Sequence, residues 1–145
     1  MHVLRNGTVV DADGAREADV AITDGEIVAV GDVGRGDSET DVSGQFVAPG
    51  LIDSHVHLMM DGRPDVATAE DESDFDHAYI AAANLRKAVE AGVTTVRDLG
   101  ASGTLALDAG RAVAEGRLDG PRVLACGQNV VMTGGHGHWF GREAD

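Results

Sequence analysis

A chain of 145 residues has the length of one ordinary domain, and its 43% hydrophobic residues are enough for a moderate core. It carries 25 acidic and 11 basic residues, a formal net charge of −14. This charge argues against nucleic acid and anionic membranes as partners, because like charges repel. No apolar run of about eighteen residues and no secretory signal is evident. The single cysteine, Cys126, cannot form an internal disulfide, which favours the reducing cytoplasm.

Residues 1–45 predict short β-strands joined by tight turns. Turns are expected at Asn6-Gly7, over residues 11–14 and at Asp24-Gly25. The last pair separates two alternating apolar runs, and both of its residues tolerate a positive φ, so it predicts a hairpin with a type I′ turn. The Gly-, Asp- and Ser-rich residues 31–41 are expected to form a polar loop.

From residue 46 onwards the pattern alternates between strand and helix. An apolar strand ends in the His-x-His of residues 55–57, and an acidic loop follows it. A helix is predicted to begin after Ser73, with Asp76 three residues later as in a capping box, and to end at Gly92. The apolar stripe expected on this helix consists of Ala78, Ala82, Leu85 and Val89.

The remaining chain repeats this alternation. A β-branched strand covers residues 93–98, a second helix runs from Ser102 to Gly116, and a third strand covers residues 122–127. A glycine-rich loop over residues 133–139 comes last. Strands and helices in this order, with short connections, require a parallel sheet with right-handed crossovers. The fold class is therefore α/β, and helices are expected to cover the faces of the sheet.

Functional groups of a parallel α/β sheet gather at the carboxyl ends of its strands. Here the first strand ends in His55 and His57, the second ends in Asp98, and the loop after the third carries His136 and His138. Three consecutive strands therefore deliver ionisable groups to one rim. We expect the functional site there.

The two histidines of the first strand are candidate metal ligands. Side chains alternate with period two along a strand, so His55 and His57 should face the same way, and Asp53 should share their face. Two imidazoles at this spacing can hold one metal ion and leave further positions open. The pattern alone does not exclude two histidines on a solvated strand, although the apolar strand before them makes that unexpected.

The other singled-out residues have two interpretations each. Asp53 and Asp98 either support the metal ligands without touching the metal or make structural hydrogen bonds, in the case of Asp98 between the second strand and a neighbouring loop. Cys126 is expected to be a small buried apolar residue. His77 is expected at the surface.

Several segments resemble one known superfamily. Pro49-Gly50-Leu51-Ile52-Asp53-Ser54-His55-Val56-His57 is similar to the opening motif of the amidohydrolases. Residues 4–11 and 18–27 look like strands of the small β-sandwich of that superfamily. Residues 92–100 and 115–123, with the Thr-Gly-Gly-His-Gly of residues 133–137, resemble its imidazolonepropionase-like and prolidase-like branch.

This resemblance implies a (β/α)₈ TIM barrel, of which residues 49–145 would form about three βα units, preceded by a partial β-sandwich over residues 1–48. It implies that His55 and His57 bind the more buried metal of a binuclear centre, usually zinc. It also implies hydrolysis of a carbon–nitrogen bond in a small amide, cyclic amide or dipeptide by a metal-activated hydroxide. His136 would hydrogen-bond a carbonyl or carboxylate of the substrate, unless it is a surface histidine in a loop.

The chain departs from the family in length. Eight βα units need about 250 residues, and the remaining metal ligands and the general base of the family would lie downstream of this sequence. The isolated chain is therefore expected to be inactive, and a homo-oligomer or a complementing chain is an expected partner. Two alternatives are open: a non-catalytic fragment that needs a partner chain, and a small metal-binding protein that uses His55, His57, His136 and His138.

The acidic composition generates the first prediction. Lys87 is the only lysine among the 11 basic residues, and an acidic excess of this kind is similar to that of extremely halophilic archaeal proteins. Salt at molar concentration shortens the Debye length to about 3 Å, so self-repulsion is screened. Dialysis into dilute buffer should therefore reduce the far-UV circular dichroism, and molar KCl should restore it. A full signal in dilute buffer would contradict salt adaptation.

Overall fold

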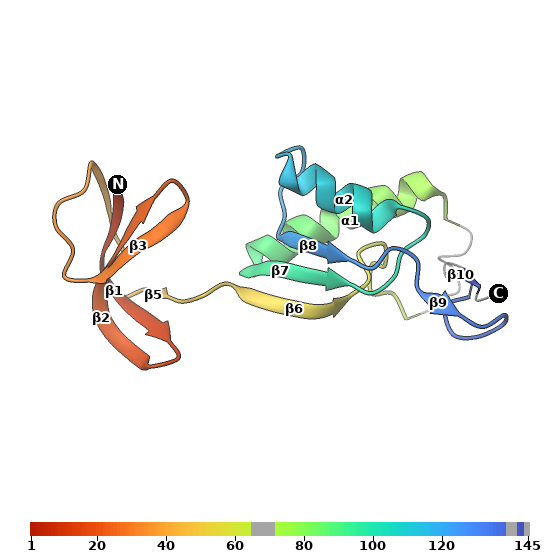
Figure 1. The fold of residues 1–145 in the computed structure, drawn as a ribbon, viewed down its shortest axis with the longest axis horizontal. Coiled ribbons are helices and arrows are strands. Elements are labelled where there is room, and N and C mark those ends of the chain that lie inside the picture. Colours follow the sequence, from red (N-terminus) through yellow and green to blue (C-terminus); the bar gives the residue numbers. More distant parts are fainter. Residues whose placement is uncertain (65–71, 139–141, 144–145) are drawn as a thin grey trace. The chain divides into compact units, whose positions relative to one another are not determined.

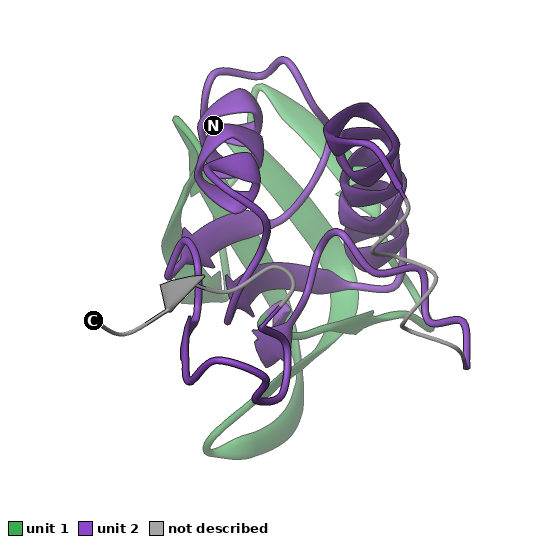
Figure 2. Ribbon diagram, turned by 90° about the vertical axis from the view of Figure 1, so that its right-hand side faces the viewer, with its two compact units in different colours: residues 1–49 green, residues 50–145 purple. Residues whose placement is uncertain are grey.

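The computed structural model describes residues 1–64, 72–138 and 142–143. The chain divides into two compact units, residues 1–49 and residues 50–145 (Figure 1, Figure 2). The first unit, which is described throughout, is built from strands alone. The second alternates strands with helices and carries His55 and His57.

The first unit is a five-stranded sheet in the order β3-β2-β1-β4, with β5 also paired to β1. Its elements are β1 (His2–Asp11), β2 (Gly14–Thr23), β3 (Glu26–Gly31), β4 (Ser38–Asp41) and β5 (Phe46–Val47). Neighbours along the chain pair antiparallel from β1 to β3, whereas β4 and β5 run parallel to β1. The expected polar loop over residues 31–41 therefore contains a strand, β4. The backbone of this strand pairs with the edge of β1 that faces away from β2.

The two asparagine- and aspartate-glycine pairs behave differently. Asp24 and Gly25 have φ of 52° and 80° between β2 and β3, which confirms the predicted hairpin turn. The turn predicted at Asn6-Gly7 is wrong. Asn6 has φ of 61°, but it lies inside β1, where the register against β2 shifts between Leu4 and Gly7. The positive φ therefore serves a β-bulge within one continuous strand.

Arg5 connects the parts of this first unit. Its guanidinium donates to Asp19 of β2 at 2.7 Å, to the carbonyl oxygens of Val33 and Gly34 at 2.6 and 2.9 Å, and to Glu39 of β4. The hydrogen bond from Arg5 holds the pKa of the Glu39 carboxyl below its usual value. One planar donor group thus fixes β1, β2, β4 and the loop before β4 against each other.

The second unit contains a three-stranded parallel sheet in the order β6-β7-β8. Its elements are β6 (Leu51–Val56), α1 (Asp74–Glu90), β7 (Val93–Asp98), α2 (Leu105–Ala114), β8 (Arg122–Ala125), and the short parallel pair β9 (Val130–Val131) and β10 (Arg142–Glu143). No helix among the described residues is long and apolar enough to cross a membrane.

Both helices lie on the same face of this sheet (Figure 1). A core of Leu58, Ala81, Leu85 and Val96 joins the loop after β6, α1 and β7, and residues of α2 and β8 pack against it. Strands in sequential order, with every helix on one side, are the arrangement of a barrel, whereas a doubly wound sheet carries helices on both faces. The sheet thus confirms the α/β fold class, and its layout favours a barrel.

The predicted start of α1 is confirmed, but its predicted apolar stripe is mostly wrong. Ser73 is the N-cap, and its hydroxyl and the Asp76 side chain form a capping box. The buried residues of α1 are His77, Ala81 and Leu85, and of the predicted stripe only Leu85 is among them. The helix is rich in alanine on more than one side, so hydrophobicity alone could not choose its buried face. His77, expected at the surface, is 4% exposed.

The opposite face of the β6-β7-β8 sheet is open in the described structure. Ile52 of β6 is 72% exposed and Leu124 of β8 is 53% exposed. Cys126, expected to be buried, is also exposed, because it continues the alternation that turns Leu124 away from the helices. The expectation that helices cover both faces is therefore wrong, and the apolar runs reflect one packed and one open face.

Gly50, the residue before β6, lies close to Thr94 and leads to the second prediction. A Cβ atom on Gly50 would lie 2.1 Å from Oγ1 and 2.2 Å from Cγ2 of Thr94. Gly50→Ala should therefore separate the starts of β6 and β7 and lower the free energy of unfolding by about 1–3 kcal/mol. Chemical denaturation followed at 222 nm reports the second unit, because α1 and α2 both belong to it.

A compensating variant provides the control. Thr94→Ala removes the two closest atoms, so the double variant should recover part of the stability lost in Gly50→Ala. Unchanged stability of Gly50→Ala would show that the strands accommodate a methyl group at this position.

Candidate metal centre

His55 and His57 lie at the carboxyl end of β6, at the edge of the sheet to which β7 and β8 also point (Figure 1). His55 is the penultimate residue of β6, and His57 follows its last residue. The two ring centroids are 5.4 Å apart, and the ring planes are inclined by 75°. His55 is exposed and His57 is partly buried. The two imidazoles are thus close neighbours at the rim.

Asp53 does not share the face of His55 as expected. The pairing of β6 with β7 shifts register between Asp53 and Val56, so strict alternation is interrupted at this point. Asp53 pairs with Val96, which is 2% exposed and packs under the helices, and the Asp53 side chain therefore faces the helix side. Its carboxylate accepts a hydrogen bond from the backbone N–H of His55 at 3.1 Å.

The ring of His57 is oriented by a backbone carbonyl. Its Nδ1 lies 2.9 Å from the carbonyl oxygen of Gly100, in the loop after β7. A carbonyl can only accept, so Nδ1 carries the hydrogen, and in the neutral imidazole Nε2 carries the lone pair. A histidine that donates from one nitrogen to a carbonyl while the other nitrogen can coordinate is the usual arrangement of a metal ligand.

Asp98 holds the same two loops together. Its carboxylate is completely buried and accepts from the backbone N–H of Leu58 at 2.8 Å and from that of Gly100 at 2.9 Å. Leu58 follows His57, and Gly100 supplies the carbonyl that His57 contacts. Of the two interpretations of Asp98, the structure shows the tie between β7 and the neighbouring loop, and that loop is the one that carries His57.

A further residue, Asn84, fixes this loop and was not predicted from the sequence. The amide of Asn84, on α1, donates to the carbonyl oxygens of Leu58 at 3.0 Å and Met60 at 2.6 Å. Met59 between them is completely buried, and its sulfur accepts from the backbone N–H of Ser102 at 3.3 Å. The sequence offered one indication of this role. Asn is unfavourable in the interior of a helix, so an asparagine within an alanine-rich helix suggests a specific hydrogen bond.

The second pair of histidines is not grouped with His55 and His57 in the described structure. His136 and His138 are exposed and lie in the turn that follows β9. This turn is closed by hydrogen bonds from the N–H of Gly135 to Met132 and from the N–H of His138 to Gly135. Among the described residues, no group of three or more His, Cys, Asp or Glu side chains is placed to hold a metal ion. The described structure therefore does not gather the four histidines of that alternative into one group.

A cavity of about 480 Å³ adjoins His57 on the helix side of β6. Its lining includes Asp53, His57, Asp61 and Lys87, so charged groups of both signs face it. Hydrogen bonds from the Arg63 side chain hold the pKa of the Asp61 carboxyl below its usual value. Lys87, the only lysine of the chain, is exposed and borders this cavity.

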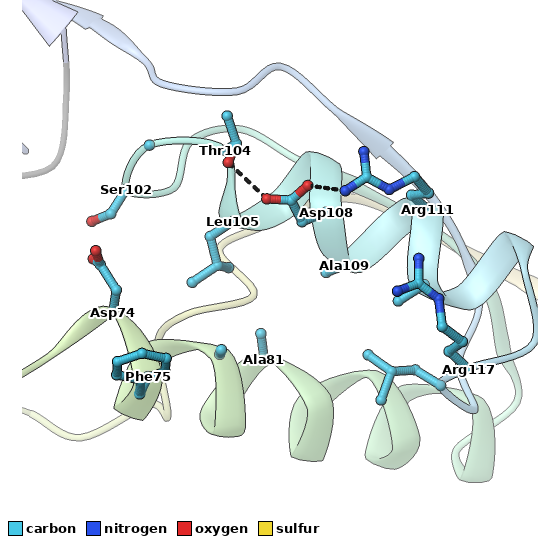
Figure 3. Close-up of a pocket in the computed structure, with 14 residues that line it drawn as sticks. Asp74, Phe75, Ala81, Ser102, Thr104, Leu105, Asp108, Ala109, Arg111 and Arg117 are labelled. Carbon is cyan, nitrogen blue, oxygen red and sulfur yellow. Dashed lines mark hydrogen bonds and ion pairs between the residues drawn. The ribbon is translucent and has the colours of Figure 1, made fainter.

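A second cavity, of about 550 Å³, lies between α1 and α2 (Figure 3). Phe75, Ala81 and Leu105 contribute apolar lining, and Asp108 at its edge accepts from Thr104 and Arg111. None of the predicted site residues lines it. The candidate site is therefore at the rim of the sheet and not in this larger space.

Residues 46–143 match the amidohydrolase family. The chain belongs to this family. Residues 1–53 also match the N-terminal domain of the urease alpha subunit. The β6-β7-β8 sheet with its two helices is accordingly the N-terminal part of an amidohydrolase (β/α)₈ barrel, as the sequence motifs predicted.

Sequence relatives and solved structures both match this chain over part of their own length. Allantoinase from Desulfitobacterium hafniense (strain Y51) is 44% identical over 68 residues, which are 46% of this chain and 15% of the relative. A prolidase solved with N-methylphosphonate-L-proline superposes with a TM-score of 0.87 at 27% identity, over 99% of this chain and 40% of the prolidase. A Xaa-Pro dipeptidase with bound methionine gives 0.80 at 27% identity, over 94% and 36%. The chain thus spans less than half the length of each of these three proteins.

The third prediction concerns the two backbone hydrogen bonds that the Asp98 carboxylate accepts. Asn at this position keeps one acceptor oxygen but turns an NH₂ donor toward a backbone N–H, so Asp98→Asn should cost about 1–3 kcal/mol of unfolding free energy. The ¹⁵N resonances of the His57 ring should shift as well, because Gly100 loses its anchor. Asp108→Asn, at an exposed position of α2, is the matched control. Unchanged His57 resonances would show that Asp98 does not position this side chain.

Proposed function

We propose that this chain provides the first ligand pair, His55 and His57, of a divalent-metal centre in a hydrolase of carbon–nitrogen bonds. Zinc suits two imidazole ligands, and the complete family fold would hold two metal ions. The remaining ligands and the general base would come from residues beyond the described ones, among which no group of three or more His, Cys, Asp or Glu side chains is placed to hold a metal ion.

The observation that carries this proposal is the hydrogen bond between His57 Nδ1 and the Gly100 carbonyl oxygen. It sets the tautomer in which Nε2 can coordinate, before any metal is bound. The donor set fits a metal in part: two imidazoles 5.4 Å apart offer two of the four ligands of a tetrahedral site. A bound divalent cation would polarise the scissile carbonyl and lower the pKa of a bound water.

The chain's own residues have distinct roles in this proposal. His55 and His57 hold the cation, while Asp98 and Asn84 fix the loop behind them. His136 would donate to a carbonyl or carboxylate of the substrate from the turn after β9. Small amides, cyclic amides and dipeptides are the proposed substrates, supported by the allantoinase and prolidase relatives.

A second candidate function is that of a fragment that needs a complementing chain, because the sheet has an exposed face. Ile52 and Leu124 are apolar and largely exposed there, and β6 and β8 each pair with one neighbour in the described sheet. Further strands, supplied by this protein or by another chain, would bury both edges.

Zinc titration of the 145-residue chain tests the ligand pair. Imidazole NMR resonances of His55 and His57 should respond first. Loss of a residue that only hydrogen-bonds a metal ligand typically weakens metal binding by about 10-fold to 100-fold. Loss of a ligand itself should cost at least as much, so His55→Ala and His57→Ala should each weaken zinc binding by this factor or more. His2→Ala is the control, since His2 bonds Ser38 in the first unit. Zinc that binds equally well to His57→Ala would refute the pair. Tight stoichiometric binding that also involves His136 and His138 would restore the four-histidine site.

A further inference from the structure

The sheet has one face packed by helices and one face without them. Val96, Val123 and Ala125 pack into the helix-side cores. The pairing of β7 with β8 places Thr95 beside Arg122 and Arg97 beside Leu124. Because side chains alternate along a strand, these four residues project from the helix-free face. His55 belongs to that face too, since the adjacent Val56 packs against the helix-side core.

Arg97 is fixed next to His55. Its Nε donates to the carbonyl oxygen of Ser54, the residue before His55, at 2.8 Å. The register of β6 against β7 is interrupted at this point, so the Ser54 carbonyl is available to a side chain instead of the strand ladder. Among the described residues, Ser54 is the one hydrogen-bond partner of the Arg97 side chain. The two terminal nitrogens of Arg97 therefore have no hydrogen-bond partner among the described residues.

The charge of this face is opposite to that of the chain. The sequence carries 25 acidic residues against 11 basic ones. Within β6, β7 and β8, however, the two acids are Asp53 and Asp98, and both lie on the helix side. Arg97 and Arg122 are left as the charged residues of the helix-free face. In a chain this acidic, two arginines without a strand acid beside them make a local anion-attracting surface.

We propose that Arg97 is a substrate-binding residue that holds a carboxylate of the substrate beside the metal-ligand pair. A guanidinium anchored through Nε presents its two terminal nitrogens as a planar fork, which matches the two oxygens of a carboxylate. The anchor on Ser54 sets that fork next to His55. This inference rests on the proposed function, because it places the carboxylate of the amide substrate near the metal centre.

A purely structural role makes a different prediction. Satisfying the Ser54 carbonyl needs only one N–H donor, which an amide side chain can also supply. Arg97→Gln keeps such a donor and removes the charge and the fork. Arg97→Lys keeps the charge without the fork. Arg122→Met is the matched control, since it removes the other arginine of the same face, two register positions away.

The experiment compares N-acetylglycine with N-acetylglycinamide, which differ only in the carboxylate. Both are titrated into the full chain, with and without Zn²⁺, and followed by NMR. The wild-type chain and Arg122→Met should prefer the acid by about tenfold, as expected for a charge-assisted hydrogen bond. Arg97→Gln should lose the preference, and Arg97→Lys should keep part of it. The Arg97 side-chain N–H resonances should shift with the acid alone.

The outcomes separate this inference from the metal centre. Equal binding of acid and amide by the wild-type chain, or an acid preference that survives in Arg97→Gln, would overturn the role of Arg97. Zinc binding that is unchanged in Arg97→Gln would leave the ligand pair standing in either case. If the wild-type chain binds no zinc but shows an Arg97-dependent acid preference, the carboxylate site is upheld and the metal centre is refuted.

Discussion

The buried carboxylate of Asp98 is the contact on which the candidate site depends. It is completely buried and accepts hydrogen bonds from two backbone N–H groups, one in the loop after β6 and one in the loop after β7. Burying a carboxylate is unfavourable unless such donors compensate it. The two loops are thereby held at a fixed separation, and the Gly100 carbonyl reaches the His57 ring. The position of the His57 ring thus follows from strand ends that are tied together.

The irregular register between β6 and β7 also shapes the candidate site. Two shifts interrupt this pairing, one near Gly50, where β6 approaches Thr94 closely, and one just before the histidines. The second shift sends Asp53 to the helix side and leaves His55 on the open side. It also frees the Ser54 carbonyl that Arg97 occupies. A bulge next to a functional site that redirects side chains is a recurring feature of sheets.

The two faces of the sheet differ in packing and in the residues that they carry. The helix side carries the cores around Leu85 and Met59 and the buried polar groups that fix the loops. The open side carries His55, Arg97 and exposed apolar residues such as Ile52. In a barrel this side is the interior, and ligands bind at its carboxyl-terminal rim. The amidohydrolase family match is consistent with this division.

Local interactions were predictable from the sequence. The turn at Asp24-Gly25 depends on two residues that tolerate positive φ, and the start of α1 depends on Ser73 and Asp76, which bond each other across three residues. The order of strands and helices followed from hydrophobic pattern and connection length. The motif around His55 and His57 indicated the family, which the comparison over residues 46–143 shows.

What the sequence by itself determined was therefore the element order, the local turns and caps, and the family. Only the tertiary structure decided the bulge at Asn6, the buried face of α1 and the side on which Asp53 and Cys126 lie. It also showed that Asn84 and Asp98 hold the loop behind the histidines. Each of these depends on a partner far along the chain, because strand register and helix rotation are set by the surface against which an element packs.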